Sequence, residues 1–100
     1  MSVVECFYMK FHMNLRQKEK VVKGFANHRR IQIMECLAQK SESSVADISE
    51  ALKINFNTAA DHISRLEIGG LLMKRNDGNF VRHRLTNRGL VALKFIRMLD

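Results

Sequence analysis

Apolar positions recur at helical spacing through the middle of the chain. After Asn27, a residue type that favours helix N-caps, a broad apolar face continues to about Lys40. This face is formed by Ile31, Met34, Cys36, Leu37 and Ala38. A shorter helix is predicted over residues 47–53. Its buried side comprises Ile48, Ala51 and Leu52.

A three-residue link leads from this helix into the next one. Asn55 or Asn57 can cap the new helix, and the glycine pair at 69–70 ends it. One face carries Ala59, Ile63 and Leu66 at i, i+4 and i+7, which is the spacing of a buried helical stripe. Two helices joined by such a tight turn form a helix-turn-helix.

The remainder of the chain predicts a β-hairpin and a last helix. Residues 71–75 and 80–85 flank a turn at 76–79, whose Asp-Gly pair is typical of a hairpin. Residues 87–99 predict an amphipathic helix. Its apolar residues are Leu90, Val91, Leu93, Ile96 and Leu99.

The opening segment fits two structures. Apolar residues from Phe7 to Leu15 alternate with other positions, as in a strand. One face of a helix is matched equally well by Val4, Phe7, Tyr8, Phe11 and Leu15. We favour the helix, because residues 15–23 are rich in helix formers and continue it. The predicted fold is therefore a mostly α (α+β) winged helix-turn-helix, with about five helices and a two-stranded β-wing.

Composition fits one domain over residues 1–100. Hydrophobic residues make up 46% of the chain, and there is no proline. No apolar run is long enough to span a bilayer, and no secretion signal opens the chain. We expect a cytoplasmic protein with no membrane partner, in which Cys6 and Cys36 stay reduced and unpaired.

Basic charge is concentrated towards both ends of the chain, and the formal net charge is +7. Residues 1–30 carry seven Lys or Arg against two acids, and residues 73–100 also carry seven against two. Residues 31–72 carry three against six. Such a balance favours a polyanionic partner, either nucleic acid or an acidic membrane surface.

Three blocks of the chain resemble winged-helix repressors of the ArsR and MarR type. Residues 25–31, FANHRRI, are similar to the entry of that family's second helix. Residues 46–72, ADISEALKINFNTAADHISRLEIGGLL, resemble its helix-turn-helix and first wing strand, and residues 84–89, RLTNRG, resemble the end of its wing. The resemblance implies a homodimer that binds double-stranded DNA sequence-specifically at a rough palindrome and regulates transcription, as a repressor does.

The resemblance also indicates which residues contact DNA. A recognition helix buries one face and presents the other to the major groove. The contacts predicted in this helix and its cap are Asn55, Phe56, Asn57, Thr58, Ala60, Asp61, Ser64 and Arg65. Those predicted in the wing, which is mostly basic and suits a minor groove or phosphates, are Lys74, Arg75, Asn79, Arg82 and Arg84. Asn57 can pair with adenine, and Thr58 suits a phosphate or a thymine methyl.

Four positions depart from the family pattern, and at two of them Phe56 and Ala60 stand where small hydroxyl or amide residues are usual. His28 replaces its usual proline, and Asp61 stands where an arginine is common. Since an aspartate accepts from cytosine but repels phosphate, we expect affinity to depend on the wing and the basic flanks. We expect Phe56 to pack between the two helices rather than to intercalate, and His62 to pack at the edge of the buried face.

Metal and catalytic chemistry are not predicted. Family members that sense metals place cysteines on the third helix or histidines on the last one. Residues 47–53 contain neither Cys nor His, and residues 87–100 contain no His. Glycine-rich phosphate loops, paired carboxylates and activated nucleophiles are also missing from the sequence. We expect no enzyme activity, no metal and no cofactor. The sequence does not identify an effector.

The apolar ends of the chain predict self-association. They exceed what a monomer of this size needs, so we expect residues 1–23 and 87–100 to pack across a two-fold axis. Residues 27–85 then form the helix-turn-helix and wing. Two other classes fit the same pattern. One is a winged-helix module that binds protein and never DNA, and the other is a non-regulatory DNA binder in replication or plasmid partition.

Overall fold

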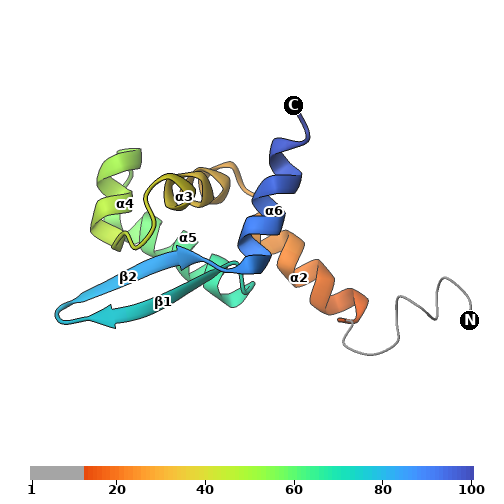
Figure 1. Ribbon diagram of the computed structural model, residues 1–100, viewed down its shortest axis with the longest axis horizontal. Coiled ribbons are helices and arrows are strands. Elements are labelled where there is room, and N and C mark those ends of the chain that lie inside the picture. The colour runs from red at the N-terminus through yellow and green to blue at the C-terminus, as the bar shows by residue number, and fades with distance from the viewer. Residues whose placement is uncertain (1–12) are drawn as a thin grey trace, which may run out of the picture.

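The computed structural model describes residues 13–100, which form five helices and one two-stranded antiparallel hairpin (Figure 1). The elements are α2 (Leu15–Phe25), α3 (His28–Gln39), α4 (Val45–Leu52), α5 (Phe56–Ile68), β1 (Leu72–Asp77), β2 (Phe80–Leu85) and α6 (Asn87–Arg97). The predicted order of elements and the mostly α winged-helix fold are confirmed over this range. The choice between strand and helix for the opening segment falls on residues 1–12, which lie outside the described residues.

Each helix begins directly after a polar residue whose side chain accepts hydrogen bonds from the first free backbone amides. Asn27 caps α3, as predicted, and Asn55 rather than Asn57 caps α5. At α4 the Ser44 hydroxyl accepts from the Asp47 amide while the Asp47 carboxylate accepts from the Ser44 amide, which is a capping box. The starts of the helices are therefore set by local side-chain chemistry.

The core is centred on α3, which packs against α4, α5, α6 and β2 (Figure 1). The stripe of Ala59, Ile63 and Leu66 on α5 is buried, as predicted. The prediction was wrong for Ala38 and Ala51, which are exposed, and it left out Ile33, which is fully buried. Ile33 lies one turn before Leu37 on the same face, and the greater apolar area of the two branched side chains decides which face turns inward.

The hairpin turn is shorter than predicted. Asn76 and Asp77 belong to β1 and pair with Val81 and Phe80, which leaves only Gly78 and Asn79 as the turn. Gly78 has φ +61, as the first central residue of a type II′ turn requires. Two-residue turns of this kind match the twist of the flanking strands, which is why the ladder extends to the tip.

The pairing register gives the hairpin an inner and an outer face. Leu72 and His83 are buried on the inner face, against α5 and α3. Met73, Arg75, Arg82 and Arg84 alternate with them and lie on the outer face. Residues 42–43 extend the ladder beside β2, because the Glu42 amide donates to the His83 carbonyl and the His83 amide donates to the Ser43 carbonyl.

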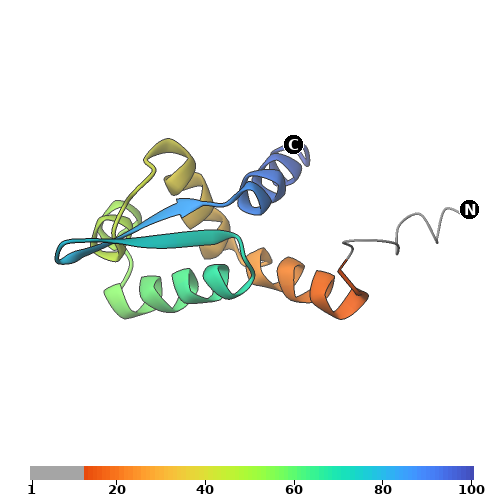
Figure 2. The same ribbon diagram turned by 60° about the horizontal axis from the view of Figure 1, so that its bottom comes forward.

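The hairpin lies alongside α5, and its tip projects at the end of the molecule where α5 begins (Figures 1 and 2). At the opposite end, α2 and α6 stretch away from the rest of the fold. The backbones of α2 and α5 approach closely at two glycines, since a Cβ built on Gly24 would lie 3.6 Å from the Cα of Gly69. The fold thus separates one end built from α5 and the hairpin from another built from α2 and α6.

Gly89 in the first turn of α6 tests how tightly this helix is seated. A Cβ built there would overlap the carbonyl oxygen of Leu71, which is backbone and cannot rotate away. We expect Gly89→Ala to lower the free energy of unfolding by about 3 kcal/mol, measured by urea denaturation at fixed protein concentration. Gly78→Ala is the control, because open space surrounds that position and only its φ of +61 is unfavourable, at about 1 kcal/mol. A loss at Gly89 no larger than that at Gly78 would contradict the tight seating.

Candidate nucleic-acid interface

The exposed side of α5 forms a ridge opposite its buried stripe. Because Ala59, Ile63 and Leu66 turn inward, the remaining positions face solvent. The predicted contacts that are exposed in and before this helix are Asn55, Phe56, Asn57, Thr58, Asp61, Ser64 and Arg65, and Ala60 is half-buried among them. The structure therefore leaves these positions on α5 accessible along a single helix.

Charge on this ridge is balanced within the helix. The Arg65 Nε donates to the Asp61 carboxylate at 3.1 Å, one turn away, and both side chains are largely exposed. An exposed pair of this kind contributes only about 0.3–0.5 kcal/mol to stability. Asp61 is thus not an isolated negative charge, and it holds the basic side chain on this face in place.

The sequence predicts that Phe56 packs between α4 and α5, but 53% of this residue is exposed. It is the first residue of α5, and side chains at a helix start lean beyond the first turn. Phe56 therefore projects past the edge of the core. Together with residues 44–46 and the hairpin residues Asn79, Phe80 and Val81, it lines a groove of about 280 Å³. The start of α5 and the tip of the hairpin meet at this groove.

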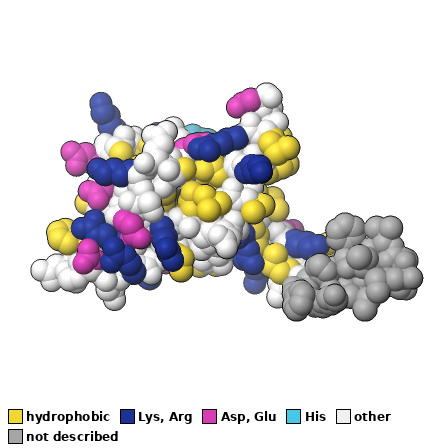
Figure 3. All heavy atoms as spheres, in the orientation of Figure 1, with side chains coloured by type: hydrophobic (Ala, Val, Ile, Leu, Met, Phe, Trp, Pro, Cys, Tyr) yellow, Lys and Arg dark blue, Asp and Glu magenta, His cyan; other side chains and the backbone are white. Residues whose placement is uncertain are grey.

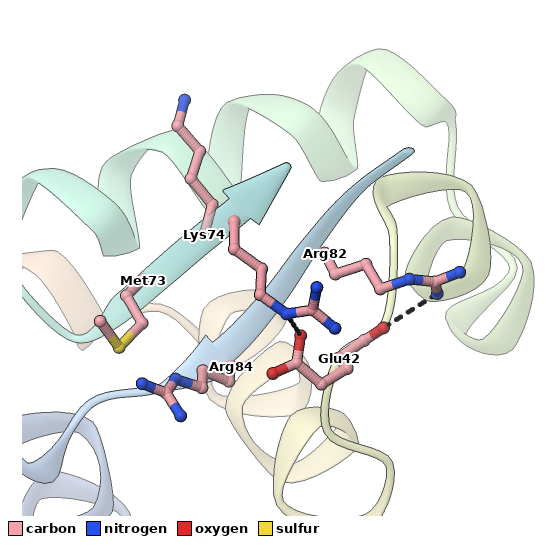
Figure 4. A pocket seen from close by; sticks show the side chains of 6 residues that line it. Glu42, Met73, Lys74, Arg82 and Arg84 are labelled. Carbon is pink, nitrogen blue, oxygen red and sulfur yellow. Dashed lines mark hydrogen bonds and ion pairs between the residues drawn. The ribbon is translucent and has the colours of Figure 1, made fainter. Parts of the chain in front are cut away.

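The basic side chains of the hairpin divide between its two faces. Lys74 lies on the inner-face register and pairs with Glu67 of α5 at 3.6 Å. Arg75 and Arg82 lie on the outer face. Arg75 donates to Glu42 at 3.0 Å (Figure 4), and Arg82 donates to Asp77 at 2.9 Å. The Arg82 bond holds the pKa of the Asp77 carboxyl below its usual value. The Arg84 side chain has no hydrogen bond or ion pair with any other described residue.

His83 anchors the hairpin and was missed as a structural residue in the sequence analysis. Only 2% of it is exposed; its Nδ1 lies 3.1 Å from the Ser43 carbonyl oxygen and its Nε2 lies 3.7 Å from a Glu67 oxygen. The alternation of β2 carried the signal, since His83 falls between two arginines and thus faces the other side. This clamp fixes the arginines of β2 relative to α5.

A second basic surface was also missed. Lys20, Lys23, Arg30 and Arg65, which come from three different helices, surround a hollow of about 300 Å³. The net positive charge of residues 1–30 was its only signal. Next to this surface, His62 is half-buried, as predicted, and burial with the charge of Arg30 lowers the pKa of its imidazole. Arg65 thus belongs both to this basic surface and to the exposed ridge of α5.

Other chemistry receives little support from residues 13–100. Within this range, no three His, Cys, Asp or Glu side chains lie close enough together to hold a metal ion. Cys36 is a free, half-buried thiol whose pKa is raised by burial, which makes it a weak nucleophile. None of the described helices has the length and apolar character needed to cross a membrane. Cys6 lies outside the described residues.

Comparison with known proteins supports the interpretation of α5 and the hairpin as parts of a winged helix-turn-helix. A family of winged helix-turn-helix DNA-binding domains matches residues 27–72. The HTH-type transcriptional regulator Rv0324 of Mycobacterium tuberculosis is 35% identical over 79 residues, which cover 79% of this chain and 34% of that protein. The chain therefore spans about a third of this curated relative.

Solved structures share both fold and sequence with the chain. The homodimeric winged helix-turn-helix domain of Mb0332 from Mycobacterium bovis, a possible ArsR-family regulator, is 31% identical with a TM-score of 0.77. The match covers 85% of this chain and 79% of that one. Reduced HlyU from Vibrio cholerae is 25% identical with a TM-score of 0.73, over 84% of this chain and 88% of its own. With the geometry of α4, α5 and the hairpin, these similarities show that the chain belongs to the family of winged helix-turn-helix DNA-binding domains.

Proposed function

We propose that the protein acts as a homodimeric, repressor-like regulator that binds a specific, roughly palindromic DNA site in the cytoplasm. The main observation in support is that the exposed ridge of α5 and the tip of an arginine-rich hairpin lie at the same end of the molecule (Figures 1 and 2). A helix in the major groove and a hairpin at the neighbouring minor groove need this arrangement. Lys and Arg side chains lie over the hairpin in Figure 3, with Asp and Glu side chains among them.

In this mode of binding, the first turns of α5 read bases. Asn57 is exposed at the helix start and its amide can bond adenine in two places, while Thr58 contacts a phosphate or a thymine methyl. The groove between Phe56 and the hairpin tip receives the DNA strand that separates the major from the minor groove. Asn79 at the tip then reaches the minor groove, and the arginines of the hairpin neutralise phosphates.

Self-association is supported by the apolar surface at the other end of the molecule. The exposed large hydrophobic residues of α6 and the turn after it are Leu90, Val91, Phe95, Met98 and Leu99. On α2, Leu15 and Val22 are exposed as well. A patch of this kind is typical of an interface. We infer that residues 1–23 and 87–100 form the dimer contact and that residues 27–85 form the DNA-binding unit, as the homodimeric Mycobacterium bovis relative suggests.

The proposal as a whole is tested by selecting bound fragments from genomic DNA. Enrichment of palindromic sites near promoters is expected, whereas arrays of repeats at a replication origin or partition locus would favour a non-regulatory DNA binder. Negligible binding to any duplex at low salt would favour the protein-binding alternative.

Arg84 measures the contribution of the wing. We expect Arg84→Ala to weaken binding to specific and random duplexes alike, and to reduce the slope of log affinity against log salt by about one, because one fewer counterion is released. Fluorescence anisotropy with labelled duplexes over a range of KCl concentrations gives the slope. Lys94→Ala removes the same charge from α6, at the end away from the hairpin tip. Because α6 belongs to the proposed dimer contact, the variant is first shown to keep the wild-type mass, and its slope is then expected to match the wild type. An unchanged slope for Arg84→Ala would mean that Arg84 does not contact phosphate.

Asp61 tests how the α5 ridge meets DNA. Asp61→Asn removes a charge that repels phosphate and releases Arg65 from its 3.1 Å ion pair. We expect affinity for random duplexes to rise by about twofold, as the roughly 0.3–0.5 kcal/mol of this exposed ion pair allows. Gel-shift titration at fixed salt provides the measurement, with Glu50→Gln on α4 as the charge-matched control. Loss of binding would instead show that the carboxylate accepts from a base.

The dimer surface is tested by placing a charge in it. Val91→Glu sets a carboxylate in the apolar face of α6, which is unfavourable when the face is covered by a second copy. We expect the variant to sediment as a monomer at micromolar concentration and to bind a palindromic duplex at least about tenfold more weakly. Met73→Glu on the outer face of the hairpin introduces the same charge and should leave the mass unchanged. A dimeric Val91→Glu would place the interface elsewhere.

A further inference from the structure

The outer face of the hairpin contains a hollow of about 160 Å³ (Figure 4). Its lining consists of Glu42, Met73, Lys74, Arg75, Arg82 and Arg84. One water molecule occupies about 30 Å³ in the liquid, so the hollow has room for a group the size of a phosphate. Its positive charge comes from Arg75, Arg82 and Arg84, because the Lys74 side chain points away from the hollow and pairs with Glu67 on the other face (Figure 4). The only carboxylate among the lining residues comes from the loop between α3 and α4.

Glu42 is held in this hollow in an unfavourable backbone conformation. Its φ is +68, in the left-handed region that non-glycine residues seldom adopt. Two bonds hold it there: its amide donates to the His83 carbonyl at 2.8 Å, and Arg82 Nη1 donates to its carbonyl at 3.2 Å. Strained residues persist only where surrounding contacts determine them, and they are frequent at functional sites. The loop thus positions a carboxylate against the arginines at a cost in backbone energy.

The contacts of this carboxylate resemble those that a phosphate makes. Glu42 Oε2 accepts from Arg75 Nε at 3.0 Å, in a charge-assisted bond of the kind guanidinium groups make equally with carboxylate and phosphate. Arg82 is shared between Asp77 and the Glu42 carbonyl, while Arg84 has no such partner among the described residues. The hollow therefore keeps an excess of positive charge with Glu42 in place.

We propose that this hollow is a subsite for a DNA backbone phosphate, which Glu42 occupies in the free protein. The inference rests on the proposed function, because it assigns a role to the outer face of the same wing. A phosphate that enters the subsite takes over the Arg75 contact and displaces the Glu42 side chain. Glu42 thereby competes with DNA, so the wing adds less to binding of random DNA than its arginines alone predict. Base contacts from α5 then account for a larger share of the total affinity.

The test is Glu42→Gln, which keeps shape and removes the competing charge. Binding to a random-sequence duplex is measured by fluorescence anisotropy over a range of KCl concentrations. We expect the affinity to rise by up to about fivefold and the salt dependence to become steeper. Glu50→Gln is the control, because Glu50 is exposed on α4, outside both the hollow and the proposed dimer contact, and its substitution changes the net charge equally. Equal gains in both variants would overturn the subsite, since they would reflect net charge alone.

A double-mutant cycle with Arg75 isolates the competition. Arg75→Ala is expected to weaken binding only slightly in the wild type, where Glu42 neutralises it, and at least about threefold more in the Glu42→Gln background. Equal losses in the two backgrounds would overturn the proposal. If Glu42→Gln is unfolded by circular dichroism, Glu42→Gly replaces it, because glycine accepts a φ of +68 without strain. A wild-type protein that binds no duplex refutes the proposed function, whereas a binding wild type with an unaltered Glu42→Gln refutes only the subsite.

Discussion

Burial of one face of α5 against α3 is the contact on which the remaining structure depends. Ile63 and Leu66 lie within the same cluster as Ile33, Met34 and Leu37, and all five are almost completely buried. Burying side chains of this size stabilises the fold by roughly 1.5–3 kcal/mol each. Since a helix cannot bury both sides here, the opposite side of α5 must face outward. The same packing that stabilises the domain therefore creates the exposed surface that we propose contacts DNA.

The hairpin depends on this contact in turn. Leu72 joins the cluster from β1, and His83 bonds to Ser43 while lying close to Glu67. A two-stranded hairpin alone is marginally stable in water, so the anchoring residues decide where its arginines lie. The exposed ion pairs on the hairpin are individually weak and can exchange partners with phosphate at little cost. The buried contacts of Leu72 and His83 thus fix the position of the wing. Its weak ion pairs leave the arginines able to exchange an acidic partner for a phosphate.

Elements with strong local signals were predictable from sequence. The buried stripe of α5 and the cap at Asn27 follow from spacing and from hydrogen bonds within a few residues. The hairpin followed from its Asp-Gly pair, although the length of its turn did not, because Asn76 and Asp77 are typical turn residues that the ladder nevertheless incorporates. Wherever tertiary contacts decide, prediction failed. The exposure of Phe56 and the loop that brings Glu42 to Arg75, 33 positions away, have no local signature.

The close approach of Gly24 and Gly69 has a mechanical consequence. The end of α2 and the end of α5 approach each other backbone to backbone, with the Leu71 side chain packed against both glycines, so little soft material is there to absorb displacement. In the proposed dimer joined through α2 and α6, each α5 helix is therefore coupled stiffly to the symmetry axis. We therefore expect this crossing to fix the number of base pairs between the two halves of a palindromic site, so that one inserted pair weakens binding of the second half.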